Sequence, residues 1–162
     1  RHVLIVVVVA VKAAFCSGLE LNFGPDGKGN IRSEETKLAK EIGDWMKINK
    51  EAIYGTSHST VQKQDWGYFT QKGNKLYMCV FNRPINNLLK IEIPKGGIIP
   101  MKAYFLENNQ ETEIQNAGKN KRNSSLYHVA VPASYKTDRP FVIVLEMQEN
   151  TKEEGEYQQA KI

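Results

Sequence analysis

The chain has 162 residues, of which 41% are hydrophobic and 25% are charged. These values are ordinary for a globular domain and argue against a disordered chain, a collagen or a coiled coil. The length allows one domain with or without an appendage, and a complete (β/α)8 barrel, which needs about 250 residues, is excluded. Lysine and arginine number 22 and aspartate and glutamate 18, so the formal net charge is only +4. Without a basic stripe interleaved with aromatic residues, we expect no nucleic-acid partner.

The first 18 residues contain an unbroken apolar run from Val3 to Val11, which ends at Lys12. The run is shorter than the about 20 residues that cross a bilayer as a helix. A basic start and a short apolar stretch are typical of a secretory signal. The same β-branched residues are also compatible with a core segment of a truncated larger fold. Both interpretations of residues 1–18 stay open.

Residues 19–23 alternate between apolar and polar side chains and predict a strand, which a cluster of turn formers at residues 24–30 ends. Ser33 is a candidate helix N-cap, and two glutamates follow it in the first turn. The helix is expected from about Glu34 to Ile48. Its apolar face is predicted to consist of four residues at helical spacing: Leu38, Ile42, Trp45 and Ile48.

After Gly55 the pattern changes to short strands between turn signals. Seven segments have strand character: residues 66–70, 76–81, 89–93, 101–106, 111–115, 126–131 and 141–147. Residues 76–81 are apolar on both faces, which predicts a central buried strand. Six or seven strands without intervening helices predict an antiparallel β-sandwich, so the fold class is mainly β. The segment from Glu149 to Glu156 is acidic and lacks large aliphatic side chains, and residues 149–162 are predicted to form a flexible tail.

Metal and cofactor sites are not indicated. The two cysteines, Cys16 and Cys79, have no zinc-ligand spacing around them, and Cys79 is expected to pack as a small hydrophobic side chain. The glycines of residues 24–30 do not have the spacing of a dinucleotide or phosphate loop. We therefore expect no metal and no cofactor.

The residues also show no compelling pattern for acid–base or nucleophilic catalysis. Glu20 is explained by an outward strand position, Asp26 by a turn, and Glu51 by a helix cap or an ion pair. Ser57, His58 and Asp65 can be drawn as a catalytic triad, but adjacent serine and histidine side chains in a loop rarely converge, so no triad is expected. No catalytic residue is assigned.

Several aromatic residues of the β region can either stack on sugar rings or pack in the core. We expect most of them in the core, and we name Trp66 and Tyr68 as possible carbohydrate contacts. Separately, residues 123–125, Asn-Ser-Ser, match the sequence that accepts N-linked glycans in secreted eukaryotic proteins.

Two sequence blocks are informative as motifs of a protein family: LNFGPDGKGNI at residues 21–31 and IGDWMKINKEAIYGT at residues 42–56. They resemble the α-L-fucosidases of glycoside hydrolase family 29, in which the first motif ends the last barrel strand and the second precedes a C-terminal β-sandwich. WGYFT at residues 66–70 and LYMCVF at residues 76–81 are similar to the start of that sandwich. Lys50 stands where the family has glycine, and Ser57 and His58 where it has Arg-Pro. A left-handed backbone at Lys50 would cost on the order of 1 kcal/mol.

The resemblance implies four segments: residues 1–18, a last barrel strand and helix at 19–57, a C-terminal sandwich at 58–148, and the tail. It also implies a complete enzyme that releases terminal α-L-fucose with retention and takes its catalytic carboxylates from an upstream barrel. This chain alone is then expected to be inactive and to pack against such a barrel or a second copy. Fucosylated glycans are the expected partners of the complete enzyme, which would be secreted, periplasmic or lysosomal.

Two alternative hypotheses stay open. The chain can be a stand-alone secreted carbohydrate-binding or interaction module, which the signal-like start favours. It can also be a degenerate product without function, which would be expected to be unstable and to aggregate because an orphan barrel strand exposes an edge.

Overall fold

The computed structural model describes residues 24–94 and 98–148. The predicted strand at residues 19–23, the segment 1–18, Cys16 and the tail 149–162 lie outside these ranges. The helical elements are α2 (Ser33–Asn49) and the 3-10 turn η1 (Lys50–Ala52). Nine strands follow: β1 (Ser57–His58), β2 (Gly67–Lys72), β3 (Lys75–Val80), β4 (Leu88–Ile93), β5 (Ile99–Phe105), β6 (Glu111–Thr112), β7 (Ile114–Lys119), β8 (Ser125–Ala130) and β9 (Phe141–Gln148).

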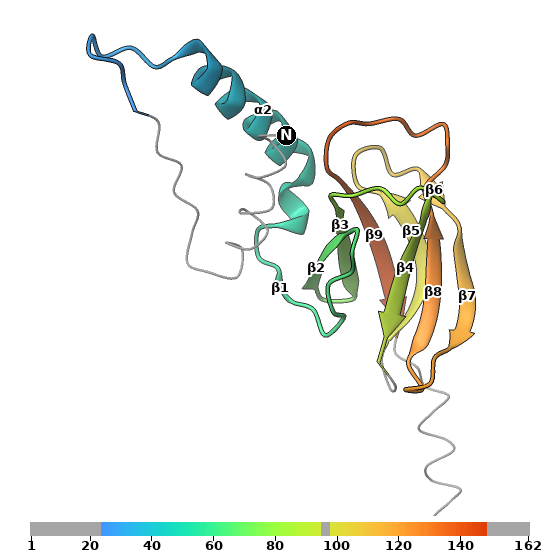
Figure 1. The fold of residues 1–162 in the computed structure, drawn as a ribbon. Coiled ribbons are helices and arrows are strands. Elements are labelled where there is room, and N and C mark those ends of the chain that lie inside the picture. The colour runs from blue at the N-terminus through green and yellow to red at the C-terminus, as the bar shows by residue number, and fades with distance from the viewer. Residues whose placement is uncertain (1–23, 95–97, 149–162) are drawn as a thin grey trace, which may run out of the picture.

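The strands form two antiparallel sheets, which confirms the predicted mainly β class. One sheet has six strands in the order β1-β2-β3-β9-β5-β6, and the other has three in the order β4-β8-β7. Figure 1 shows the sheets facing each other, with α2 rising from the β2–β3 side so that its first turns point away from the sandwich. Within the described residues, no helix is both long and apolar enough to cross a membrane.

The structure has more strands than the predicted six or seven for two reasons: one predicted strand is split in two, and one further strand is only two residues long. The predicted strand at 111–115 is split between the sheets, since β6 pairs with β5 and β7 pairs with β8. Strand β7 is almost entirely exposed, so its residues show no apolar alternation that sequence analysis could detect. Strand β1 has two residues, and both are exposed.

The core lies on both faces of the six-stranded sheet. Alternate residues of β3 and β9, such as Met78 and Ile143, face the three-stranded sheet and form the sandwich interior. The intervening residues, such as Tyr77 and Val144, face α2 and η1 and form a second cluster with Trp45. This two-sided burial confirms the prediction that residues 76–81 are a central strand.

Helix α2 matches its predicted position within one residue at each end, with two differences. The helix includes Ser33, and Arg32 occupies the N-cap position without a side-chain hydrogen bond, so the predicted Ser33 cap is wrong. Ile48 was predicted on the apolar face, but it is exposed, while Asn49 is buried and donates a hydrogen bond to the carbonyl oxygen of Trp45 (3.0 Å). The 3-10 turn tightens the helix end and brings Asn49 inward.

The expected strain at Lys50 does not occur. Lys50 has ordinary right-handed backbone angles (φ −55°, ψ −30°) because the helix continues directly into η1. The left-handed conformation is adopted five residues later by Gly55 (φ 70°), where the absence of a Cβ atom makes it inexpensive.

Hydrogen bonds fix the helical segment to the sheet. The indole Nε1–H of Trp45 donates to the carbonyl oxygen of Pro140 (2.7 Å), and the buried Thr70 hydroxyl donates to the carbonyl oxygen of Ala52 (2.6 Å). These two bonds join residues 95 and 18 positions apart. Buried carbonyl groups therefore find donors at the contact between the helical segment and the sheet.

Glu51 forms a small polar cluster at the same contact. Its Oε1 atom accepts hydrogen bonds from the Tyr77 hydroxyl (2.7 Å) and the Lys75 ammonium group (3.1 Å). The bond from Tyr77 is the larger cause that holds the pKa of Glu51 below its usual range. Burial of the phenol raises the pKa of Tyr77, so it stays a donor at physiological pH. This confirms the ion-pair interpretation of Glu51.

Replacement of Gly67 by alanine should strongly destabilise the fold. A Cβ atom at Gly67 would overlap the carbonyl oxygen of Cys79 on the paired strand, and backbone atoms cannot move aside without breaking the β2–β3 ladder. We expect a loss of about 3 kcal/mol or more in the free energy of unfolding measured with urea. The matched control is Gly43→Ala in the middle of α2, where nothing lies within 4 Å of the added atom. That change should stabilise by about 0.5–1 kcal/mol, and equal effects of both variants would contradict the packing described.

Glu51→Gln should destabilise the protein by about 1 kcal/mol at pH 7, since the side chain is partly exposed and solvent weakens the pairing. The folded-state pKa of Glu51 is lowered, so its contribution is present above the unfolded pKa of about 4.3 and is lost as the pH falls through the folded-state value. The difference between wild type and variant should therefore shrink in unfolding experiments carried from pH 7 to pH 3.

The control for Glu51 is Glu111→Gln, which removes the more exposed ion pair with Lys102. Its effect at pH 7 should be only a few tenths of a kcal/mol. A Glu51→Gln difference that stays constant or grows on acidification would show that the carboxylate does not act through these hydrogen bonds.

Candidate functional site

The turn at residues 24–30 is organised by Asp26. One oxygen of its carboxylate accepts hydrogen bonds from the backbone N–H groups of Lys28 and Asn30, both at 2.9 Å. The backbone of Asp26 also pairs with Asn30 and Gly29, and Gly29 has φ 83°. The backbone bonds lower the pKa of Asp26, so this exposed carboxylate is ionised and acts as a turn anchor.

The three carboxylates considered for acid–base chemistry do not form a described pair. Asp26 precedes α2 and Glu51 follows it, so a 17-residue helix about 25 Å long lies between them in the chain. Glu20 lies outside the described residues. The bonded Glu51 and the turn residue Asp26 both have lowered pKa values, whereas a general acid needs a raised one.

Ser57 and His58 do not face each other as the nucleophile and base of a triad would. Ser57 and His58 are successive residues of the edge strand β1, so their side chains point to opposite sides. The Ser57 hydroxyl donates to the carbonyl oxygen of Gln71 (3.3 Å). The geometry of a nucleophile oriented by a neighbouring base is therefore not formed.

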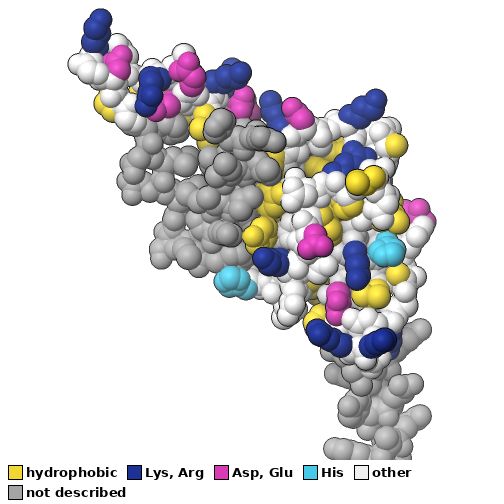
Figure 2. Space-filling view, viewed as in Figure 1, with side chains coloured by type: hydrophobic (Ala, Val, Ile, Leu, Met, Phe, Trp, Pro, Cys, Tyr) yellow, Lys and Arg dark blue, Asp and Glu magenta, His cyan; other side chains and the backbone are white. Residues whose placement is uncertain are grey.

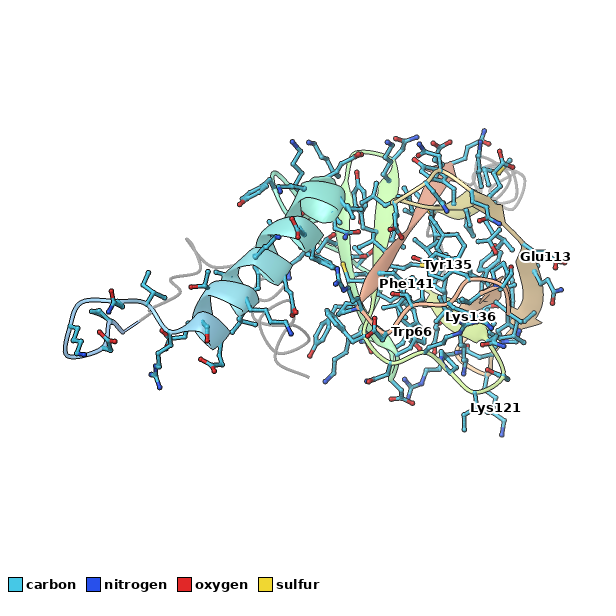
Figure 3. All side chains as sticks on the ribbon, turned by 90° about the horizontal axis from the view of Figure 1, so that it is seen from above. Trp66, Glu113, Lys121, Tyr135, Lys136 and Phe141 are labelled. Carbon is cyan, nitrogen blue, oxygen red and sulfur yellow. The ribbon has the colours of Figure 1, made fainter. Side chains whose placement is uncertain are left out.

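Of the two aromatic residues named as possible carbohydrate contacts, Trp66 lies in the core. Only 4% of its surface is exposed, its indole Nε1–H donates to the carbonyl oxygen of Lys90 (2.9 Å), and its ring packs edge-to-face on Phe69. Figure 3 shows Trp66 within the sandwich, and it belongs to the same core cluster as Phe141. Tyr77, Tyr104 and Tyr127 are buried as well. A contact with sugar therefore depends on Tyr68, whose exposure is intermediate.

Tyr68 lies in a surface groove with a volume of about 400 Å³. The groove is lined by Lys63, Gln64, Asp65, Gly67, Tyr68, Phe81 and Asn82. Tyr68 packs edge-to-face against Phe81, with ring centroids 5.8 Å apart. The Asn82 side-chain amide donates to the carbonyl oxygen of Asp65 (3.3 Å) and so ties the two walls together. We call this set of residues the Tyr68 groove.

Sequence analysis missed most of the Tyr68 groove because its lining comes from two segments. One is the turn before β2, in which Gln64 and Gly67 exchange backbone hydrogen bonds, and the other is the end of β3. The register that pairs Tyr68 with Cys79 brings the two segments together. The sequence signal for this proximity is the turn-forming pair Gly73-Asn74 between the strand segments 66–70 and 76–81, which is typical of a hairpin.

The described residues offer little reactive chemistry. Cys79 is a fully buried thiol whose pKa burial raises to about 12, so it is inert as a nucleophile. Among residues 24–94 and 98–148, no three histidine, cysteine, aspartate or glutamate side chains are placed to hold a metal ion. On the face seen in Figure 2, charged side chains of both signs are interspersed.

Comparison with known proteins gives consistent matches. No model of a protein family matches the chain. An α-L-fucosidase of Dictyostelium discoideum is 33% identical over 96 residues, which cover 56% of this chain and 21% of that protein. A plasma α-L-fucosidase of Rattus norvegicus is 27% identical over 144 residues, or 85% of this chain and 27% of that protein.

Solved structures agree with the sequence matches. A bacterial fucosidase bound to an inhibitor superposes with a TM-score of 0.77 and 33% identity, covering 94% of this chain and 33% of that one. A family GH29 α-L-fucosidase of Bacteroides thetaiotaomicron, solved as a trapped covalent intermediate, gives a TM-score of 0.75 and 34% identity over 90% of this chain and 32% of that one.

The chain thus spans between about a fifth and a third of the length of these relatives. Its similarity in sequence and in fold covers the helix and the sandwich described above. The chain is related to the α-L-fucosidases of glycoside hydrolase family 29, and its match is consistent with the C-terminal part of such an enzyme.

Proposed function

We propose that this chain is the C-terminal structural portion of an α-L-fucosidase. Residues 19–57, which sequence analysis assigns to a last barrel strand and a helix, would complete a catalytic barrel, and the sandwich of residues 58–148 would pack against it. The complete enzyme would hydrolyse terminal α-L-fucose from glycans with retention of configuration. The solved relative that carries a trapped covalent intermediate supports this mechanism, because retaining glycosidases pass through a glycosyl-enzyme species. Such an enzyme would act in a secreted, periplasmic or lysosomal setting.

The state of the carboxylates carries the proposal that this chain is not itself catalytic. Retaining glycosidases need a carboxylic acid with a raised pKa beside a nucleophilic carboxylate. Every carboxylate with a shifted pKa in the described residues is shifted downward, by backbone or side-chain hydrogen bonds that stabilise the charged form: Asp26, Glu34, Asp44 and Glu51. These groups suit turns, helix ends and ion pairs.

The purified 162-residue chain should not hydrolyse an aryl α-L-fucoside above the rate of a buffer blank. A full-length family member assayed in parallel should turn over the same substrate and so validates the assay. Turnover by the chain that survives purification controls and falls in Asp26→Asn or Glu51→Gln would overturn the assignment.

The Tyr68 groove supports a second candidate function, a carbohydrate-binding module. A partly exposed aromatic ring flanked by amide and carboxylate side chains combines an apolar face with hydrogen-bonding groups, as sugar sites require. This function does not need catalytic residues in the chain.

If the module binds glycans, Tyr68→Ala should weaken binding about tenfold or more, which corresponds to about 1.4 kcal/mol. Binding would be measured on a glycan array and then by titration of the best ligand. The matched control is Tyr54→Ala, because Tyr54 is 66% exposed and lies outside the groove. Absence of saturable binding by the wild-type chain, or equal losses in both variants, would reject this candidate.

A further inference from the structure

The turn between β7 and β8 contains the single N-linked glycosylation sequence of the chain, Asn123-Ser124-Ser125. Asn120 builds this turn: its side-chain oxygen accepts hydrogen bonds from the backbone N–H groups of Arg122 (2.9 Å) and Ser124 (3.0 Å). Its amide group donates to the carboxylate of Glu92 (2.6 Å), which ties the turn to β4. The turn therefore holds its shape without using the side chain of Asn123.

Asn123 itself is placed as an acceptor would be. Its backbone is left-handed (φ 60°), its N–H donates to the carbonyl oxygen of Asn120 (3.0 Å), and the residue is exposed. Asparagine tolerates this conformation better than most residues, so the turn selects it for a structural reason. Within the described part of the chain, no hydrogen bond occupies its carboxamide group.

We propose that the carboxamide nitrogen of Asn123 accepts an N-linked oligosaccharide when the chain passes through a eukaryotic secretory pathway. The donor is a lipid pyrophosphate-linked oligosaccharide. A bond forms between Nδ2 and the anomeric carbon of the first sugar, while the bond between that carbon and the pyrophosphate oxygen breaks. The lipid pyrophosphate leaves with the electron pair, and the nitrogen loses one proton to a base.

The position of the turn is compatible with a large substituent. Figure 1 shows the β7–β8 turn at the end of the sandwich away from α2. A glycan on this turn would therefore not disturb the contact between the helix and the sheet. Figure 3 places Lys121 of the same turn at the outer rim of the sandwich. The turn also adjoins β7, the exposed edge of the three-stranded sheet, and a glycan would shield this edge from pairing with other chains.

The test is expression of the full 162-residue chain behind a cleavable secretion leader in eukaryotic cells. Medium and cell extract are both analysed by mass before and after an amidase that removes N-linked glycans. The wild-type chain should lose mass on treatment. Asn123→Asp, which keeps the shape and the backbone preference of the residue, and Ser125→Ala, which removes the required hydroxyl, should abolish the shift.

Ser124→Ala is the matched control, since it changes the middle position and keeps the acceptor sequence intact. It should retain the amidase-sensitive mass. A wild-type chain without such mass in either fraction, or a shift that persists in Asn123→Asp, would overturn the proposal. The readout is mass, so it is independent of fucoside hydrolysis and of glycan binding, and either proposed function can fail without affecting it.

Discussion

The burial of β3 and β9 on both faces is the constraint on which the rest of the structure depends. A sandwich sheet needs one covered face, but here Tyr77, Cys79 and Val144 are buried on the side opposite the second sheet. Burial of apolar surface contributes about 25 cal/mol per Å². If the second face were uncovered, the fold would lose several kcal/mol of stabilisation and expose an apolar patch prone to aggregation. The end of α2 and the turn η1 supply the cover. The helical segment is therefore part of the folded unit that contains the sandwich.

Covering a sheet face with a helix end and loops buries carbonyl groups that need donors. The donors come from residues distant in the sequence. The Thr70 hydroxyl donates to the carbonyl oxygen of Ala52, and the Trp45 indole N–H donates to the carbonyl oxygen of Pro140. An unsatisfied buried carbonyl costs about 1–3 kcal/mol, so these bonds penalise any shift of the segment along the sheet. The cluster of Glu51 with Tyr77 adds a charged anchor at the border of the contact. Apolar burial provides the stabilisation, and the hydrogen bonds fix the register.

The predictability of the fold follows the strength of each local signal. The strand at 76–81 was predictable because it is a short, continuous apolar run bounded by turn residues, and helix α2 was predictable because its apolar residues follow the period of 3.6. Strand β7 was not, because a solvent-facing edge strand leaves no pattern. The inward turn of Asn49 and the core position of Trp66 depend on tertiary contacts. The Tyr68 groove combines two segments, so its lining required the strand register.

The electrostatics of the described residues favour a structural role over a chemical one. Carboxylates such as Asp26 and Glu51 are stabilised in the charged form, and the thiol of Cys79 is held neutral by burial. Each group is thus fixed in the protonation state that suits packing at neutral pH, whereas acid–base catalysis needs a group poised to exchange a proton. Under the proposed function, a barrel placed beside this fold would supply the proton-transferring pair. The contribution of the sandwich then lies in the stability and position of the surface that it presents.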